Sequence, residues 1–248
     1  MNVLITNDDG IHAPALARLK ESLAPLGRVV IVAPDRDQSA ASHALTLHRP
    51  FRIQQHEPDL YSVDGTPTDC VITSFYGLLD PRPELVISGI NHGPNMGEDV
   101  FYSGTVAAAI EGSLQGVPAI AASLVTREAA DFVEPARFIA RLVGRLLERG
   151  LPRRHLLNVN LPHRPWPEIR GVKVTRLGSR IYHDTLVKKV DPRGRDYYWI
   201  GGEDPEWEPI AGTDFHAVHE GWISVTPLRL DLTADSALRE MEAWDLEK

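Results

Sequence analysis

Residues 2–10 read NVLITNDDG, a short apolar run that stops at an asparagine, two aspartates and a glycine. A continuous apolar and β-branched run bounded by turn residues is typical of a strand buried on both faces. Strands of that kind belong to parallel sheets that helices cover on both sides. The stretch therefore predicts a buried strand over 2–6 whose carboxyl end enters a polar loop.

The same pattern recurs along the first two thirds of the chain, where short apolar runs alternate with stretches of helical hydrophobic spacing. The further runs cover residues 28–33, 84–88 and 118–124, and the helical stretches cover 15–23, 68–79, 106–115 and 131–148. Strand–helix alternation with apolar strands predicts an α/β fold built on a doubly wound, mostly parallel, Rossmann-like sheet. Ligands of such sheets bind at the carboxyl ends of the strands, so chemistry is expected there.

The character of the sequence changes after residue 165. All five tryptophans follow that point, and residues 177–221 alternate aromatic with charged side chains without helical spacing. The alternation predicts a β-hairpin arm, followed by a returning strand at 222–228 and a terminal helix at 234–244. We divide the chain into an α/β catalytic core at 1–165 and a C-terminal part at 166–248. An isolated ribbon cannot bury both faces, so we expect the arm to be exchanged between subunits.

Composition excludes several classes of function. With 248 residues and a formal net charge of −8, the chain lacks the general basic face that gripping a long nucleic acid requires. Cys70 is the only cysteine, which rules out an intrachain disulfide framework, a thiolate zinc site and an iron–sulfur cluster. The beginning of the chain does not resemble a secretory signal, and no apolar run approaches the roughly 20 residues that cross a bilayer. We expect a cytoplasmic protein without a membrane partner.

The adjacent carboxylates of Asp8 and Asp9 follow directly on the first predicted strand. Neighbouring like charges raise each other's pKa unless a cation lies between them. Oxygen ligands suit Mg²⁺, Mn²⁺ or Ca²⁺ rather than an ion that prefers thiolates. The alternative is an Asx turn or a helix N-cap, which aspartate also favours. The position at a strand's carboxyl end favours the divalent cation.

Two more predicted strands end in polar clusters, PDRDQSAASH at 34–43 and SGINHGPNMG at 88–97. The first taken alone is also compatible with an ordinary solvated loop. The second interleaves glycines with asparagines, whose amide oxygens can ligate a metal or accept hydrogen bonds. Both clusters are expected beside the paired aspartates, because the carboxyl ends of parallel strands share one edge of the sheet.

The segment YSGT at 102–105 precedes an alanine-rich helical stretch. Free N–H groups at a helix N-terminus attract phosphate, and the hydroxyls of Ser103 and Thr105 add two donors. An ordinary serine or threonine N-cap explains the same residues. Cys70, on the apolar face of a predicted helix, is interpreted as a core residue rather than as a nucleophile.

Five ordered blocks resemble the family of stationary-phase survival proteins SurE, which are metal-dependent 5′/3′-nucleotidases. The blocks are NDDGIHAPAL at 7–16, VIVAPDRDQSAASHALTL at 30–47, GTPTDC at 65–70, SGINHGPNMGEDVFYSGTVAAAIEG at 88–112 and GTDFHAVHEGWISVTPL at 212–228. The resemblance covers nearly the whole chain, and the segment at about 165–211 is the most variable part of such proteins. It implies one divalent cation per subunit, Mg²⁺ or Mn²⁺, and self-association to dimers or tetramers.

The resemblance also implies a role for each matching position. It assigns the cation to Asp8, Asp9, Ser39 and Asn91, and the phosphate group to Asn95, Ser103, Gly104 and Thr105. The implied reaction is hydrolysis of a nucleoside monophosphate to nucleoside and phosphate.

The catalytic groups follow from the chemistry of that reaction. A metal-bound carboxylate is within reach of a metal-bound water, so Asp8 or Asp9 is expected to accept the water proton. His43, placed near the pocket, is the candidate acid for the leaving oxygen.

Three other readings remain open. An aspartyl-phosphate phosphatase also begins with a strand followed by aspartates, but its D-x-D spacing does not occur here. A non-catalytic nucleotide or metal sensor of the stress response would keep the phosphate loop without turnover. A metal-dependent glycosyltransferase is least favoured, because no sugar-nucleotide signature is recognisable. There is likewise no P-loop and no dinucleotide fingerprint.

Overall fold

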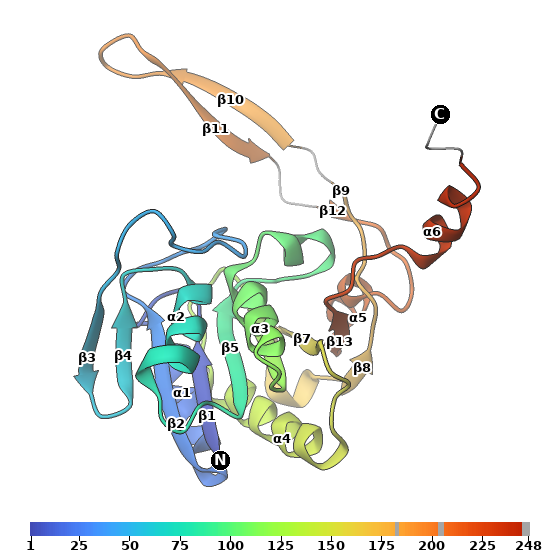
Figure 1. Ribbon diagram of the computed structural model, residues 1–248. Coiled ribbons are helices and arrows are strands. Elements are labelled where there is room, and N and C mark those ends of the chain that lie inside the picture. Colours follow the sequence, from blue (N-terminus) through green and yellow to red (C-terminus); the bar gives the residue numbers. More distant parts are fainter. Residues whose placement is uncertain (182–183, 203–205, 245–248) are drawn as a thin grey trace.

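The structure, a computed structural model, describes residues 1–181, 184–202 and 206–244 (Figure 1). Its centre is a nine-stranded sheet with the order β3-β4-β2-β1-β5-β6-β7-β13-β8. The strands are β1 (Asn2–Thr6), β2 (Arg28–Pro34), β3 (Ile53–Glu57), β4 (Leu60–Val63), β5 (Leu85–His92), β6 (Ala119–Val125), β7 (His155–Pro162), β8 (Val172–Val174) and β13 (Ile223–Arg229). Six neighbouring strands from β4 to β7 run parallel, whereas β3 and β13 pair antiparallel with β4 and β7. The doubly wound, mostly parallel sheet is therefore confirmed.

Helices cover both faces of this sheet, as Figure 1 shows. They are α1 (Pro14–Leu23), α2 (Pro67–Thr73), α3 (Gly104–Leu114), α4 (Val133–Arg149), α5 (Asp214–His219) and α6 (Asp235–Met241), with short helical turns at Ala24–Leu26, Ser74–Leu78, Gly97–Phe101 and Trp166–Glu168. Strand β1 contributes to the apolar cluster on each face of the sheet, because its side chains alternate between the two faces. Ile5 packs in one apolar cluster with helices α1 and α4, and Leu4 packs in another with α2 and α3.

The helical stretches and strands expected from hydrophobic periodicity are present with small shifts of their ends. The expected helix at 68–79 is divided, because α2 stops at Thr73 and a wider helical turn continues to Leu78. Cys70 is fully buried in the cluster beneath α2, as interpreted from the sequence. Strands β3, β4, β7 and β8 have no counterpart among the expected runs.

The C-terminal arm is shorter than the expected 177–221. Its ribbon comprises β9 (Arg180–Ile181), β10 (Asp184–Val190), β11 (Asp196–Gly202) and β12 (Glu206–Trp207), and β10–β11 extends away from the sheet in Figure 1. The expectation of continuous hairpin to residue 221 was wrong, because helix α5 occupies Asp214–His219. The Thr213 side chain caps that helix by accepting the His216 N–H. The chain then returns as β13, which joins the main sheet.

Candidate functional site

Hydrogen bonds join the polar loops that were predicted to follow the strands. Strands β1 and β5 are paired in parallel with Thr6 opposite Ser88, so their carboxyl ends lie side by side. The backbone N–H of His92 donates to Oδ2 of Asp9 at 3.3 Å. From the loop after β2, the N–H of Gln38 donates to the backbone carbonyl of Asp8 at 2.8 Å. Three segments far apart in sequence therefore meet at the paired aspartates.

The side chain of Asp8 is directed to the N-terminus of α3. Its Oδ2 accepts the backbone N–H of Thr105 at 3.1 Å, and its Oδ1 accepts the Thr105 hydroxyl. Gly104 makes this approach possible, since a Cβ there would lie 2.9 Å from Cβ and 3.0 Å from Oδ2 of Asp8. A carboxylate at a helix N-terminus is also favoured by the helix dipole. Asp8 is thus held in place by the segment that we expected to bind phosphate.

The surroundings of Asp8 and Asp9 disfavour the charged form of both carboxyl groups. Burial raises the pKa of Asp8 despite its bonds to Thr105, and burial followed by the charge of Asp8 raises the pKa of Asp9 to about 6. Within the described ranges, no lysine or arginine forms an ion pair with either carboxylate. A buried carboxylate beside a half-buried one, neither with a lysine or arginine partner among the described residues, is an arrangement that a divalent cation stabilises. The residues present fit such an ion.

Ser39 and Asn91 complete the predicted ligand set from two further loops. Ser39 is exposed, and its backbone N–H donates to Oδ1 of Asp37 at 2.7 Å, which forms a tight turn. The Asn91 side chain donates from Nδ2 to the Gly93 carbonyl at 2.9 Å, so its Oδ1 is the atom suited to ligation. The described part of the chain contains no group of three or more His, Cys, Asp or Glu that could hold a metal. Hydroxyl and amide oxygens are therefore needed beside the two aspartates.

The predicted phosphate residues differ in what their donors do. Thr105 donates both its N–H and its hydroxyl to Asp8 in this structure, so its predicted contact with a phosphate stays a prediction. The Ser103 hydroxyl caps α3 by accepting the Val106 N–H at 3.0 Å, and its own proton can still be donated. The N–H of Gly104 is the first-turn donor that neither Asp8 nor Ser103 uses.

Asn95 is held by polar side chains that sequence reasoning missed. Its Nδ2 donates to Ser123 Oγ at 2.8 Å, its backbone N–H donates to Asn160, and its carbonyl accepts from Asn158 and Asn160. All four residues are buried. The sequence carried a signal for them, because the asparagines at 158 and 160 interrupt an apolar stretch at strand spacing.

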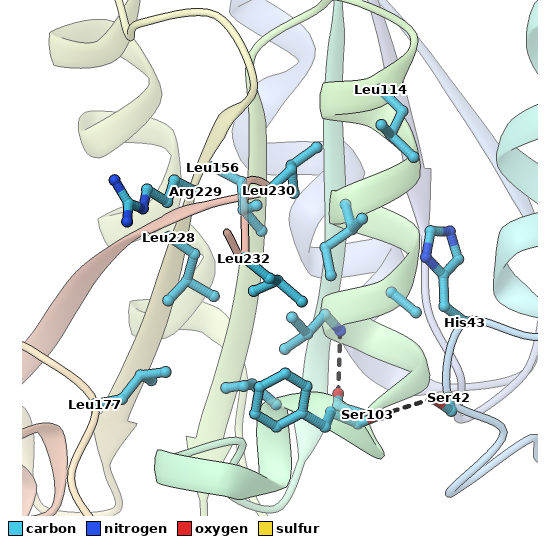
Figure 2. Close-up of a pocket in the computed structure, with 15 residues that line it drawn as sticks. Ser42, His43, Ser103, Leu114, Leu156, Leu177, Leu228, Arg229, Leu230 and Leu232 are labelled. Carbon is cyan, nitrogen blue, oxygen red and sulfur yellow. Dashed lines mark hydrogen bonds between the residues drawn. The ribbon is translucent and has the colours of Figure 1, made fainter. Parts of the chain in front are cut away.

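His43 lies apart from the paired aspartates, beside α3. Its Nε2 is 3.1 Å from Oε2 of Glu111, and this contact with His43 lowers the pKa of Glu111. The neighbouring Ser42 hydroxyl donates to the Phe101 carbonyl at 2.6 Å. Both residues line a cavity of about 430 Å³ whose other walls are mainly leucines (Figure 2).

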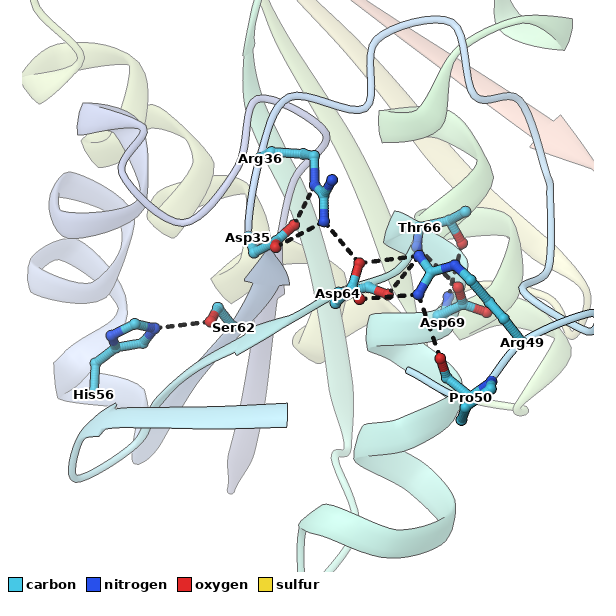
Figure 3. A network of polar contacts seen from close by, with 9 residues as sticks. All are labelled: Asp35, Arg36, Arg49, Pro50, His56, Ser62, Asp64, Thr66 and Asp69. Atoms are coloured by element: carbon cyan, nitrogen blue, oxygen red, sulfur yellow. Dashed lines mark hydrogen bonds and ion pairs between the residues drawn. The ribbon is translucent and has the colours of Figure 1, made fainter. Parts of the chain in front are cut away.

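A polar network fastens the long loop after β2 (Figure 3). Asp64 accepts from Arg36 at 2.7 Å and from both terminal nitrogens of Arg49, and Arg36 also pairs with Asp35. The hydrogen bond from Arg49 lowers the pKa of Asp64. The network ties both ends of the segment that carries Ser39 and His43 to the end of β4.

These features define a class of protein: an α/β domain with two adjacent carboxylates and a helix N-terminus at the carboxyl edge of a parallel sheet. The chain belongs to the survival protein SurE family, whose model matches residues 3–184. A protein of Geobacter sulfurreducens named 5′-nucleotidase SurE is 52% identical over 247 residues, which are 99% of this chain and 94% of that protein. A protein of Geobacter sp. strain M21 with the same name is 51% identical and matched along its whole length. The crystal structure of the SurE protein from Aquifex aeolicus is similar with a TM-score of 0.88 and 45% identity over 98% of each chain.

Proposed function

We propose that this protein is a divalent-metal-dependent nucleotidase that hydrolyses nucleoside 5′- and 3′-monophosphates to nucleoside and phosphate. The observation that carries the proposal is the adjacent pair of Asp8, which is buried, and Asp9, which is half-buried; neither has a lysine or arginine partner among the described residues, and Thr105 and His92 hold them at the edge of the sheet. Relatives of about 50% identity over the full chain are named nucleotidases. This similarity favours an enzyme over a non-catalytic nucleotide or metal sensor.

One Mg²⁺ or Mn²⁺ ion per subunit would be held by Asp8, Asp9, Ser39 and Asn91. A bound divalent ion polarises a phosphoryl oxygen and lowers the pKa of a coordinated water. The remaining phosphate contacts are assigned to Asn95, to the Ser103 hydroxyl and to the Gly104 N–H. Thr105 acts on this site through Asp8, whose two oxygens it holds.

The proton of the attacking water is assigned to Asp9. Both oxygens of Asp8 accept hydrogen bonds from Thr105, whereas among the described residues the Asp9 side chain accepts one long bond, from the His92 N–H to Oδ2. Oδ1 of Asp9 is therefore the freer base. His43 remains the candidate acid for the leaving ribose oxygen, and its Nε2 lies 3.1 Å from Oε2 of Glu111.

We further propose that the chain assembles through its arm into dimers or tetramers and acts in the cytoplasm in stationary-phase survival. In this proposal residues 1–165 form the catalytic core and residues 166–248 form the oligomerising part. Exposed apolar side chains on β10 and β11 support the assembly. The single buried cysteine suits a reducing compartment. In the part of the chain that the structure describes, no helix has the length and apolar character to cross a membrane.

The test is phosphate release from a panel of nucleoside monophosphates with Mg²⁺, Mn²⁺ and no added metal. Turnover that requires the metal supports the proposal. Binding of nucleotide and metal without release of phosphate would establish the sensor instead. Trapping of a phospho-aspartate would establish an aspartyl-phosphate mechanism.

A further inference from the structure

A second cavity, of about 330 Å³, opens directly beside Asp9. It is lined by Asp9, His12, Ile90, His92 and Phe132, together with the start of α1. The three parts of its wall come from the loop before α1, the end of β5 and the start of α4. This volume lies in the range of small-molecule sites, and one end of the cavity is a proposed metal ligand.

The walls of this cavity suit a flat heteroaromatic ring. Ile90 and Phe132 are buried and form an apolar base, whereas the imidazoles of His12 and His92 are exposed at the opening. Histidine rings are among the side chains on which nucleobases stack. The cavity therefore combines apolar surface with two stacking groups and polar ring nitrogens.

The orientation of one imidazole is fixed by the backbone. Nε2 of His92 is 2.6 Å from the Glu128 carbonyl, which can only accept, so Nε2 carries the proton. The backbone N–H of the same residue donates to Asp9. The wall of the cavity and the proposed catalytic base are thus parts of one connected unit.

Two other cavities fit this role less well. The cavity of about 430 Å³ beside α3 has mainly apolar walls, and although Ser103 and His43 line it, it contains neither Asp8 nor Asp9 (Figure 2). A hollow of about 440 Å³ between α1 and α4 is lined by three arginines and contains neither aspartate. Of these three cavities, the one beside Asp9 is the one lined by a proposed metal ligand, so a ring bound there would lie next to the carboxylates.

We propose that the cavity between His12 and His92 binds the nucleobase of the nucleotide, with His12 as a specificity-determining residue that stacks on the base. This inference rests on the proposed nucleotidase function, and it adds the location of the nucleoside. The phosphate then lies toward Gly104, and the base lies in the cavity beside Asp9.

The experiment compares adenosine monophosphate with ribose 5-phosphate, which lacks the base, on the metal-loaded full-length protein. We expect His12→Ala to raise KM for adenosine monophosphate about 10-fold with little change in kcat, because one stacking wall is lost. kcat/KM for ribose 5-phosphate should change less than about twofold. His12→Phe should restore the low KM, and free adenosine should inhibit the wild type competitively but not His12→Ala.

Two further variants control for folding and for the choice of cavity. Ala13→Leu, which narrows the cavity, should also raise KM for adenosine monophosphate and spare ribose 5-phosphate. Leu232→Ala, in the exposed wall of the other cavity, should leave both substrates unaffected. The inference is overturned if Leu232→Ala raises KM for the nucleotide while His12→Ala and Ala13→Leu, with unchanged thermal midpoints, do not. A wild type that hydrolyses neither substrate would instead overturn the proposed function.

Discussion

The carboxylate of Asp214 accepts the backbone N–H of Gly97 at 2.9 Å, although 117 positions separate the two residues. The same carboxylate accepts the N–H of Gly178 at 2.8 Å and that of Phe215 at 2.9 Å. Asp214 is completely buried. It therefore fastens the loop between Asn95 and Ser103, the proposed phosphate residues, to the chain that leads into the arm.

Removal of this carboxylate should destabilise the protein. Asp214→Ala leaves three backbone N–H groups without their acceptor in the interior, so the free energy of unfolding should fall by at least about 2 kcal/mol. Activity should fall as well, because the loop that carries Asn95 loses its anchor. Urea denaturation and the thermal midpoint measure the first effect. An Asp214→Ala protein as stable as the wild type would show that the three donors find other partners.

The buried carboxyl group of Asp214 should make the free energy of unfolding depend on pH. Burial raises its pKa above the ordinary 3.8, even though backbone N–H groups from Gly97, Gly178 and Phe215 oppose this effect. The folded protein therefore binds the proton more tightly than the unfolded chain, and stability falls as pH rises from 3.8 through the folded pKa. Asp214→Asn does not titrate. The stability of the wild type relative to this variant should therefore be higher at pH 4 than at pH 7, and the opposite order would contradict the shift.

Thr105 should act on metal binding rather than on phosphate binding. Thr105→Val removes the hydroxyl that donates to Asp8 but keeps the backbone N–H. We expect a loss of about 1–2 kcal/mol in unfolding free energy and a higher metal concentration at half-maximal activity. Thr105→Ser should restore both. Ser103→Ala serves as the contrast, because it should weaken competitive inhibition by inorganic phosphate and spare the metal requirement.

Gly104 should tolerate no side chain. In Gly104→Ala the new Cβ would displace Asp8, and a shift of about 1 Å at a catalytic group lowers kcat/KM about 100-fold. Gly144→Ala is the matched control, since Gly144 lies in α4 with nothing within 4 Å of the added Cβ. The control should gain about 0.5–1 kcal/mol in unfolding free energy with full activity. Equal activity of the two variants would mean that Gly104 is replaceable.

Removal of the metal or of a carboxylate should abolish turnover. EDTA should inactivate the enzyme reversibly, with Mg²⁺ or Mn²⁺ restoring activity, and Asp8→Asn and Asp9→Asn should each be nearly inactive. Without metal, Asp9→Asn should melt at or above the wild-type temperature, because it removes a repelling charge. Asp8→Asn should melt lower, since an amide cannot accept both Thr105 donors. Full activity in metal-free buffer would contradict the account.

The arm should hold subunits together. On β11 the side chains of Tyr198, Trp199 and Ile200 are more than half exposed and point alternately to the two faces of the ribbon. Such apolar surface on a monomer marks an interaction site. Light scattering at micromolar concentration should give the mass of at least a dimer, and Trp199→Ser with Ile200→Ser should lower it. A monomeric wild type would remove the proposed role of the arm.

Local patterns in the sequence determined the α/β layering and the edge of the sheet at which the site lies. Continuous apolar runs specify buried parallel strands, and the polar residues that end them must emerge together, as Asp8 and Asp9 do beside the loop after β5. Short strands with mixed polarity, such as β3, and helix α5 inside the aromatic segment escaped detection. Their stability comes from pairing and capping rather than from hydrophobic period.

Only the tertiary structure decided which partner each polar side chain takes. The sequence placed Thr105 at a helix N-terminus but did not show that Asp8, 97 positions away, would take its donors. In the same way Asp214 meets Gly97, and His12 meets His92 across one cavity, because strand order and helix packing bring distant segments together. Hydrogen bonds act over about 3 Å, so long-range partners depend on the fold and leave no local periodicity in the sequence.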